Sequence, residues 1–382
     1  MTAAQRGEWP FLDFLRATSA LLVLFGHTRN WFFLSIASVD HPGLLLKAFW
    51  FLTVVEQESV IVFFVLSGFL VGGSIVRACA ADRFNLAAYL TARFARIYVV
   101  FLPALALTFV IFAVGGALLR DPGGDAIRPL FSERQLDFGG LHLLLCHLAG
   151  VQGFACPAWS QNPPLWSLGY EWTLYLTAPL LIGLSMMQRP LAWRVAGVVL
   201  VVAMLLALST DLVDCLFWVS TWFLGVVAAV LAKREVPVPT ALGAIGLGAA
   251  VAAVAVARLQ FAPVLLTHEI IALGVALAMS CRGIIGLSIL PRFFRWLAGF
   301  SFSLYATHLP VVFLSIALLQ SWGFPTNKVA PGPVPFVEFG VTVLAAMVVA
   351  YLFSLVTERQ TDRLRMLLSQ ARGPARPALA AG

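Results

Sequence analysis

Long apolar segments alternate with short polar ones along the whole chain. Each apolar segment approaches the length of a membrane-spanning helix, since a bilayer core takes about 20 predominantly apolar residues. The expected spans are 10–34, 49–76, 92–118, 165–184, 195–208, 212–231, 242–256, 264–279, 294–319 and 337–356. Apolar Gly/Ala-rich flanks allow the fifth and seventh spans to extend further. The pattern predicts an all-α, polytopic membrane protein with about ten transmembrane helices.

The composition of the 382-residue chain agrees with this prediction. Hydrophobic residues make up 60% of the chain and charged residues only 11%, and the mean hydropathy is +0.92. A soluble domain carries about 25% charged residues. The net charge is +7, but no basic patch interleaved with aromatics lies on a soluble domain. The sequence therefore argues against a nucleic-acid partner and for a lipid bilayer around the protein.

Most basic residues of the loops are expected on one side of the membrane. Loops on the side of the N-terminus contain most of them: Arg6, Arg77, Arg83, Arg93, Arg96, Arg189, Arg194, Lys233, Arg234, Arg282, Arg292, Arg295, Arg359, Arg363, Arg365, Arg372 and Arg376. Cytoplasmic loops carry an excess of Lys and Arg. We therefore expect both termini in the cytoplasm and the protein in the cytoplasmic (inner) membrane. Residues 1–360 would form the membrane domain, and residues 361–382 a basic, disordered cytoplasmic tail.

The expected outer loop, 119–164, contains a short apolar piece at 141–154. About 14 residues are too few to span a bilayer, so this piece is expected to be an interfacial or re-entrant helix. Cys146 and Cys156 lie in the same loop, where either a disulfide or a reduced buried pair fits. The five cysteines of the chain lack the spacing of a zinc site, so no metal is expected.

The first span combines an apolar sequence with two titratable groups, Arg16 and His27. At 100° per residue, eleven residues amount to about three turns, so both side chains project from one helix face, about 16 Å apart along the axis. Such residues are expensive at membrane depth and usually mark a pathway or a wet cavity. Asp13 lies one turn before Arg16 and is a plausible ion partner. The alternative is snorkelling of the two side chains to opposite interfaces.

Two further polar groups lie beside otherwise apolar spans. Ser67 and Gly68 occur in FFVLSGFL, where small residues most simply indicate close helix packing. Arg93 and Arg96 are about one turn apart in YLTARFARIY. They fit either positive-inside anchoring or a clamp for phosphate groups, which guanidinium forks suit.

Two more polar groups lie within or near apolar spans. Glu171 and Tyr175 are one turn apart in LWSLGYEWTLYL, and an unpaired carboxylate there is more often functional than structural. His308 occurs in SLYATHLP, with Tyr305 before it and Pro310 after it. A proline-kinked helix lining a cavity and a satisfied core histidine fit this segment equally well.

Taken in order, these motifs resemble the acyltransferase-3 family of integral-membrane O-acyltransferases. The resemblance rests on five features: an arginine and a histidine separated by ten residues (Arg16, His27), FFVLSGFL, the Arg-x-x-Arg pair, LWSLGYEWTLYL and SLYATH. The resemblance implies transfer of an acyl group from acyl-CoA, most simply acetyl-CoA, to a hydroxyl group. It further implies a surface or exported polysaccharide, or a lipid-linked sugar, as the acceptor.

The chain departs from the family pattern in two places. Family members often carry an acidic residue just before the FF pair, whereas this chain has Ser59-Val60-Ile61-Val62 there, with Glu58 as the nearest substitute. We also expect the protein to act without the esterase-type domain that some relatives append. A separate periplasmic partner would then complete transfer to the acceptor if the membrane domain does not.

The resemblance implies roles for the polar residues. Arg93 and Arg96 would hold the CoA phosphates, and Arg16 would orient the thioester end. His27 would be the general base or a transient acyl carrier, assisted by Glu171 and His308. The supporting residues would be Asp13, Glu58, Ser67, Tyr175 and Tyr305.

Three alternatives remain open from the sequence. A secondary transporter or flippase of a sugar or lipid also places His and Arg in spans, but it should show internal repeats, and no convincing repeat is found. A non-catalytic scaffold would use the polar residues as packing contacts. An acyltransferase acting on a small glycosylated secreted metabolite fits as well as one acting on a polysaccharide.

Overall fold

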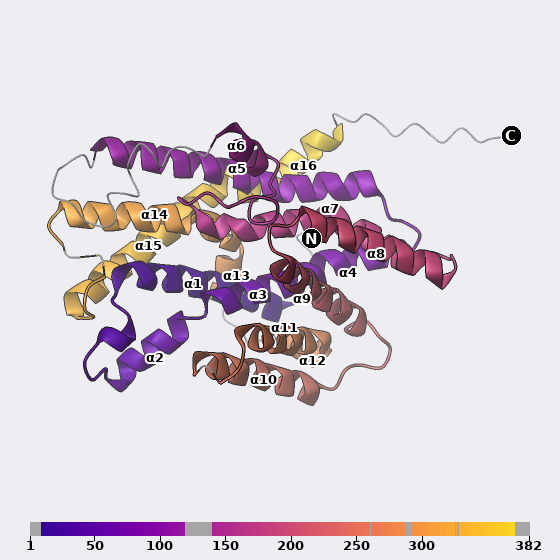
Figure 1. Cartoon of the computed structure of the whole chain (residues 1–382), viewed down its shortest axis with the longest axis horizontal. Helices are drawn as coiled ribbons and strands as arrows, with labels where there is room; N and C mark the ends of the chain where they lie inside the picture. Colours follow the sequence, from indigo (N-terminus) through magenta and orange to yellow (C-terminus); the bar gives the residue numbers. More distant parts are fainter. Residues whose placement is uncertain are drawn as a thin grey trace.

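The computed structural model describes residues 9–118, 140–259, 261–287, 292–324, 326 and 328–370. The regular elements of these residues are helices packed into one bundle, most of them along its long axis (Figure 1). The helices are α1 (Pro10–Phe32), α2 (Leu44–Thr53), α3 (Glu56–Ser67), α4 (Gly73–Ala80), α5 (Leu86–Leu118), α6 (Leu141–Leu148), α7 (Trp166–Met186), α8 (Leu191–Leu208), α9 (Leu212–Leu231), α10 (Thr240–Arg258), α11 (Val264–Ser280), α12 (Arg282–Ile285), α13 (Arg292–Ala298), α14 (Ser301–Ser321), α15 (Pro333–Val356) and α16 (Thr361–Gln370). A π-helical segment, η3 (Gly68–Gly72), joins α3 to α4, and the 3₁₀ turns are η2 (Ile36–Ser38), η6 (Pro163–Leu165) and η7 (Glu358–Gln360).

The prediction of an all-α, multi-pass membrane protein is confirmed. Within the described residues, seven helical stretches are long and apolar enough to cross a bilayer, and α11 is a slightly shorter apolar helix. Two other expected spans, α1 and α7, have 23 and 21 residues. They fall outside this set because polar residues lower their hydropathy. These are the helices that carry Arg16, His27 and Glu171.

Two of the expected spans are interrupted. The second is divided between α2 and α3 at Val54–Val55, and the ninth between α13 and α14 at Gly299–Phe300. The fifth and seventh spans do extend, because α8 begins at Leu191 and α10 covers Thr240–Arg258.

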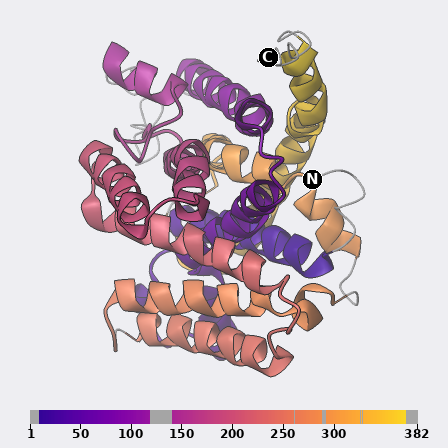
Figure 2. The ribbon, with the colours of Figure 1, turned by 90° about the vertical axis from the view of Figure 1, so that its right-hand side faces the viewer.

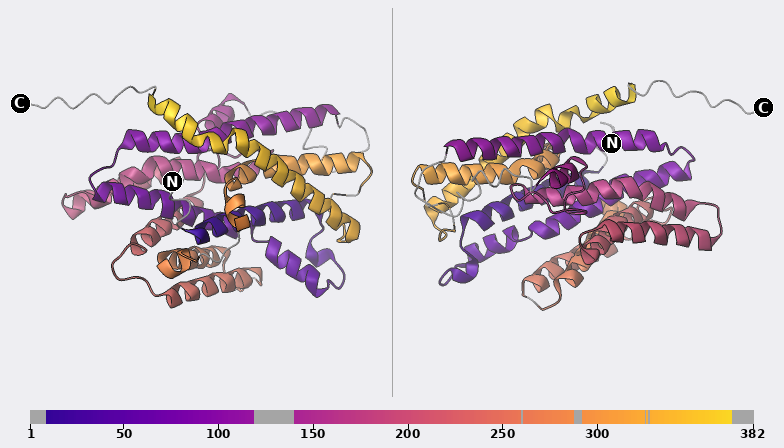
Figure 3. Two further views of the ribbon diagram at one scale, coloured as in Figure 1. Left: turned by 180° about the vertical axis from the view of Figure 1, so that it is seen from behind. Right: turned by 45° about the horizontal axis from the view of Figure 1, so that its top comes forward.

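Helix α1 lies in the interior of the bundle, in contact with α3, α13, α14 and α15. Helices α10 and α11 lie side by side as a pair next to α9 (Figure 2). From behind, α15 runs obliquely across the bundle and leads into α16, which packs against α5 (Figure 3). Residues 361–370 were expected within a disordered tail, but they form α16, because apolar residues on one face of this amphipathic helix give it a docking surface. Residues 371–382 of that expected tail lie outside the described residues.

Helices α3 and α9 approach each other at two glycines. A Cβ atom on Gly68 would lie 1.8 Å from the carbonyl oxygen of Trp222, and one on Gly225 would lie 2.1 Å from that of Val65. The absence of side chains thus lets the two backbones touch, as expected of small residues in membrane helix pairs. This contact brings the end of α3, and with it Ser67, against α9.

Prolines inside α7 and α14 leave carbonyl groups that side chains from other segments bind. Pro310 has no N–H, so the carbonyl of Ala306 lacks its usual donor four residues on. The Asn162 side-chain amide donates to that oxygen at 2.9 Å. In α7, Pro179 likewise frees the carbonyl of Tyr175, which accepts a hydrogen bond from the Tyr89 hydroxyl at 3.1 Å. Both helices therefore continue through their prolines.

The apolar piece of the expected outer loop forms α6 and then an irregular segment. Cys146 and Cys156 are joined by a disulfide, one of the two states that the sequence allowed. The buried imidazole of His147 fixes the same loop, because its Nδ1 lies 2.7 Å from the Leu143 carbonyl and its Nε2 accepts the Trp159 N–H at 2.9 Å. Residues 119–139 of the loop lie outside the described residues.

We expect this loop to lose stability in acid. Burial lowers the pKa of His147 below its usual value of 6.5. The folded loop keeps the imidazole neutral, whereas the unfolded loop binds a proton, so stability falls as the pH drops below about 6.5. Protonation of Nε2 would also remove the acceptor for Trp159 N–H. Thermal unfolding of the solubilised protein between pH 8 and pH 5 should show a fall in midpoint that His147→Gln reduces; an identical fall in the variant would contradict this account.

Candidate active site

A cavity of about 600 Å³ opens at the end of the bundle where α1 begins and α15 ends. Its walls come from α1, α3, η3, α4, α5, α7, α14 and the segment around η7. Eight of the residues singled out in the sequence line it: Asp13, Arg16, Ser67, Arg93, Arg96, Glu171, Tyr175 and Tyr305. Residues as far apart in the sequence as Asp13 and Tyr305, from five different helices, thus line one cavity.

The cavity is strongly cationic. Its lining contains Arg16, Arg77, Arg93, Arg96, Lys233, Arg295, Arg359 and Arg365, against Asp13, Glu171, Glu358 and Asp362. Such an excess of positive charge around a concave, partly apolar site raises the local concentration of anions. The cavity therefore suits a ligand with several negative charges.

The three arginines expected to bind the acyl donor are held in different ways. The Arg93 guanidinium lies 5.8 Å from the Tyr89 ring centre and 5.7 Å from that of Tyr175, and its Nε is buried without a hydrogen-bond partner among the described residues. Arg96 pairs with Glu358 at 3.0 Å. The Arg16 guanidinium lies 3.9 Å from the Asp13 carboxylate, as the helix spacing predicted.

A hydrogen-bonded cluster surrounds Glu171 in the cavity lining. The Glu171 Oε1 atom accepts from the Tyr175 hydroxyl at 2.5 Å and from Ser67 Oγ at 2.9 Å. Ser67 in turn accepts the indole N–H of Trp222 at 3.1 Å. The resemblance implied that Glu171 assists His27, but the hydrogen bonds of Glu171 in the structure are with Ser67 and Tyr175.

His27 and His308 form a stacked pair. Their ring centres are 5.1 Å apart with an angle of 8° between the planes, and His27 Nδ1 lies 2.8 Å from His308 Nε2. His308 is fully buried, whereas His27 retains some exposure. Neither lines the cationic cavity. The sequence placed both histidines at membrane depth, and the structure shows that they touch.

The hydrogen bonds of the pair define its tautomers. His308 Nδ1 lies 2.8 Å from the Tyr305 carbonyl and 3.1 Å from the Leu304 carbonyl, so this nitrogen carries the proton, because a carbonyl oxygen only accepts. His308 Nε2 is then the acceptor, and His27 Nδ1–H donates to it. In this neutral arrangement neither Nε2 atom carries a proton, but the lone pair of His308 Nε2 is used within the pair. His27 Nε2 keeps the lone pair that a general base needs.

Tyr305 lies between the cavity and the histidine pair. Its ring lines the cavity and is centred 6.0 Å from the His308 ring and 5.8 Å from the Phe63 ring. Its hydroxyl bonds Ser167 Oγ at 2.7 Å and the Pro164 carbonyl at 2.8 Å. A donor in the cavity is therefore separated from the histidines by about one side chain.

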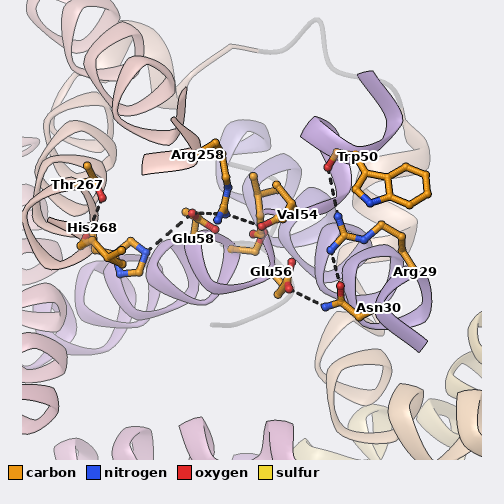
Figure 4. A network of polar contacts seen from close by, with 12 residues as sticks. Arg29, Asn30, Trp50, Val54, Glu56, Glu58, Arg258, Thr267 and His268 are labelled. Atoms are coloured by element: carbon orange, nitrogen blue, oxygen red, sulfur yellow. Dashed lines mark hydrogen bonds and ion pairs between the residues drawn. The ribbon is translucent and has the colours of Figure 1, made fainter. Parts of the chain in front are cut away.

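Glu58 lies away from the cavity, in a polar network at the other end of α1 and α3 (Figure 4). Its Oε1 pairs with Arg258 at 2.5 Å and lies 3.9 Å from His268 Nε2. A second part of the network joins Arg29 through Asn30 to Glu56, with bonds of 2.5 and 2.9 Å. Its expected role as a supporting residue, in place of the family's acidic residue before the FF pair, stays a prediction.

Three residues that contact the cavity residues or α14 were not singled out from the sequence. Glu358 follows the last expected span and has no motif around it. Trp222 is one of many tryptophans in apolar segments. Asn162 had a detectable signal, because an asparagine before two prolines cannot continue a helix and is free to bind backbone groups. Within the described residues no group of three His, Cys, Asp or Glu side chains has the geometry of a metal site.

Comparison with known proteins identifies the family. A family model described as an acyltransferase domain, of the acyltransferase-3 type, matches residues 9–355. The chain is 30% identical over 203 residues to nodulation protein 10 of Rhizobium leguminosarum bv. viciae, a match covering 50% of this chain and 47% of that protein. It is 26% identical over 159 residues to an uncharacterised protein of Haemophilus influenzae, covering 41% and 61% respectively. The chain thus matches about half to three-fifths of these curated relatives, and no solved structure shows a significant match. The chain belongs to the acyltransferase-3 family, and its apolar helices are those of a multi-pass membrane protein.

Proposed function

We propose that the protein is an O-acyltransferase of the cytoplasmic membrane that moves an acyl group, in the first place acetyl, from acyl-CoA to a hydroxyl group of a carbohydrate. The observation that carries the proposal is a cationic cavity that Tyr305 separates from a histidine with a free Nε2. The acceptor is a surface or exported polysaccharide or a lipid-linked sugar.

The cavity matches the chemistry of a CoA donor. CoA carries a diphosphate and a 3′-phosphate, and arginine forks bind phosphate oxygens with short, charge-assisted hydrogen bonds. Arg93 offers a buried, unpartnered Nε, and Arg96 is already oriented by Glu358. Arg16, nearest to His27 along α1, would orient the pantetheine end toward the histidines. The apolar part of the lining, which includes Phe63 and Phe64, suits the pantetheine and acyl groups.

The histidine pair supplies the proton transfer. His27 Nε2 would remove the proton from the acceptor hydroxyl while its oxygen attacks the thioester carbonyl. A C–O bond forms, the C–S bond breaks, and the CoA sulfur leaves and takes up the proton that His27 received. His308 Nε2 would stabilise the protonated His27 by accepting its Nδ1–H, the role that an orienting group has beside a catalytic histidine.

The test is mass spectrometry of surface and secreted glycans from a deletion strain complemented with wild-type protein, His27→Ala or the exposed control His142→Ala. We expect the mass of one hydroxyl-linked acyl group on a glycan in the wild-type and His142→Ala strains alone. Its identity gives the acyl group, and its carrier gives the acceptor. A change confined to small secreted glycosides would replace the polysaccharide as acceptor. Failure of labelled acyl-CoA to transfer to any fraction would overturn the proposal.

A further inference from the structure

The segment after α15 contributes a wall of the cavity, although it lies beyond residues 9–355 that match the family domain. The lining residues from this segment are Glu358, Arg359, Thr361, Asp362 and Arg365. Helix α16 holds the segment in place by packing against α5, the helix of Arg93 and Arg96. The family motifs therefore describe only part of the cavity.

Glu358 is the fixed point of this segment. Its side chain is only 5% exposed, and both of its oxygens are used. Oε1 pairs with Arg96 Nη2 at 3.0 Å, and Oε2 accepts two hydrogen bonds of 3.0 Å from the backbone N–H and the hydroxyl of Ser303. The second pair of bonds caps the first turn of α14, where backbone N–H groups have no helical partner. A carboxylate at a helix N-terminus is also stabilised by the helix dipole.

These contacts connect the two halves of the proposed reaction. Arg96 belongs to the donor cavity, and α14 carries Tyr305 and His308 further along. Glu358 contacts both Arg96 and Ser303 of α14, at 3.0 Å each. The Arg96 guanidinium, with its side chain 35% exposed, would otherwise adopt several rotamers at the cavity wall.

We propose that Glu358 is a positioning residue for the acyl-CoA site, which holds the Arg96 guanidinium and the start of α14 in the arrangement that binds the donor. The inference rests on the proposed function, because it takes the ligand of the cavity to be acyl-CoA. It makes the segment 357–370 part of the donor site and not a peripheral tail.

Charge makes the test decisive. Glu358→Gln removes a negative charge from the cavity, which by electrostatics alone would tighten the binding of an anionic donor. We expect the opposite: CoA binds about tenfold more weakly, because the charged bond that orients Arg96 is lost. Titration calorimetry with CoA, on protein in lipid nanodiscs, measures this directly. The exposed Glu235→Gln, which removes the same charge from a nearby loop, is the matched control and should bind as wild type does.

A double-mutant cycle shows whether Glu358 acts through Arg96. In an Arg96→Gln background the additional effect of Glu358→Gln on CoA binding should vanish, whereas independent effects would add. In transfer assays Glu358→Gln should raise KM for acyl-CoA with little change in kcat, since its amide oxygen still accepts from Ser303. Glu358→Ala should lower kcat as well, because the cap of α14 is lost.

The outcomes separate this inference from the proposed function. Unchanged or tighter CoA binding by Glu358→Gln, or additivity in the cycle, overturns the role of Glu358 while acyl-CoA remains the donor. Failure of the wild-type protein to bind CoA overturns the proposed donor and this inference with it. If Glu358→Gln does not accumulate, Glu358→Asp serves the same test, because its shorter side chain cannot reach Arg96 and Ser303 together.

Discussion

Replacing His27 with alanine should abolish measurable acyl transfer while the protein accumulates normally in the membrane. The hydrogen bonds of the histidine pair leave His27 Nε2 without a proton, and the variant removes this base. General base catalysis by a positioned side chain contributes about 10²- to 10⁴-fold to a rate, so kcat should fall by at least that lower bound. Transfer of labelled acyl groups by membranes with matched protein levels is the measurement.

Variants of His308 make the expectation more specific. His308→Ala should also lower kcat, but less than His27→Ala, because His27 keeps its base and loses only the group that orients it. The exposed His142→Ala should leave the rate unchanged and controls for histidine loss as such. Full activity of His27→Ala would remove His27 from the chemistry. An equal loss in both variants would mean that the pair acts as one unit.

The hydrophobic pattern was sufficient for the helices but not for their interruptions. Long apolar segments predict helices because every backbone polar group must be satisfied within the bilayer. The break at Val54–Val55 has no proline or glycine to announce it, although the polar run Glu56–Ser59 follows directly. Pro310 does remove a donor from the hydrogen-bond ladder of α14, as expected, but the helix continues. Asn162, from a distant segment, supplies the donor that the proline lacks, and only the tertiary structure provides that contact.

Helical periodicity indicated which side chains share a face, but not which faces meet. It placed Arg16 and His27 on one side of α1 and Asp13 next to Arg16, and the structure agrees for the ion pair. The contact between His27 and His308 joins residues 281 positions apart, and no local spacing contains that information. Helix packing that brings these faces together depends on side-chain shapes along whole helices.

Burial explains why Glu358 was overlooked. A glutamate just after an apolar segment, followed by arginines, has the sequence pattern of a solvated helix end. Its function depends on Arg96 and Ser303, which come from two other helices. The sequence suggested Glu58 as a substitute for the acidic residue that family members carry before the FF pair, but it could not show that Glu58 contacts Arg258 and His268 in a separate network.

Arg93 and Arg96 should govern the affinity for the acyl donor. Variants of Arg93 are easier to interpret, because variants of Arg96 also leave Glu358 without its cation. Arg93→Gln with Arg96→Gln should raise KM for acyl-CoA by about 100-fold, since each lost charge-assisted bond costs about 1.5–3 kcal/mol before solvent screening. Arg93→Lys keeps the charge but loses the planar fork and its stacking on Tyr89 and Tyr175, so its KM should fall between those of wild type and Arg93→Gln.

The control is the exposed Arg189→Gln, outside the cavity lining, which should leave KM unchanged. Comparing acetyl-CoA with acetyl-dephospho-CoA then locates the contact: the variant that loses discrimination between them has lost the arginine that binds the 3′-phosphate. If Arg93→Lys and Arg96→Lys both retain the wild-type KM and discrimination, these residues are positive-inside anchors, and the phosphates bind elsewhere in the cavity.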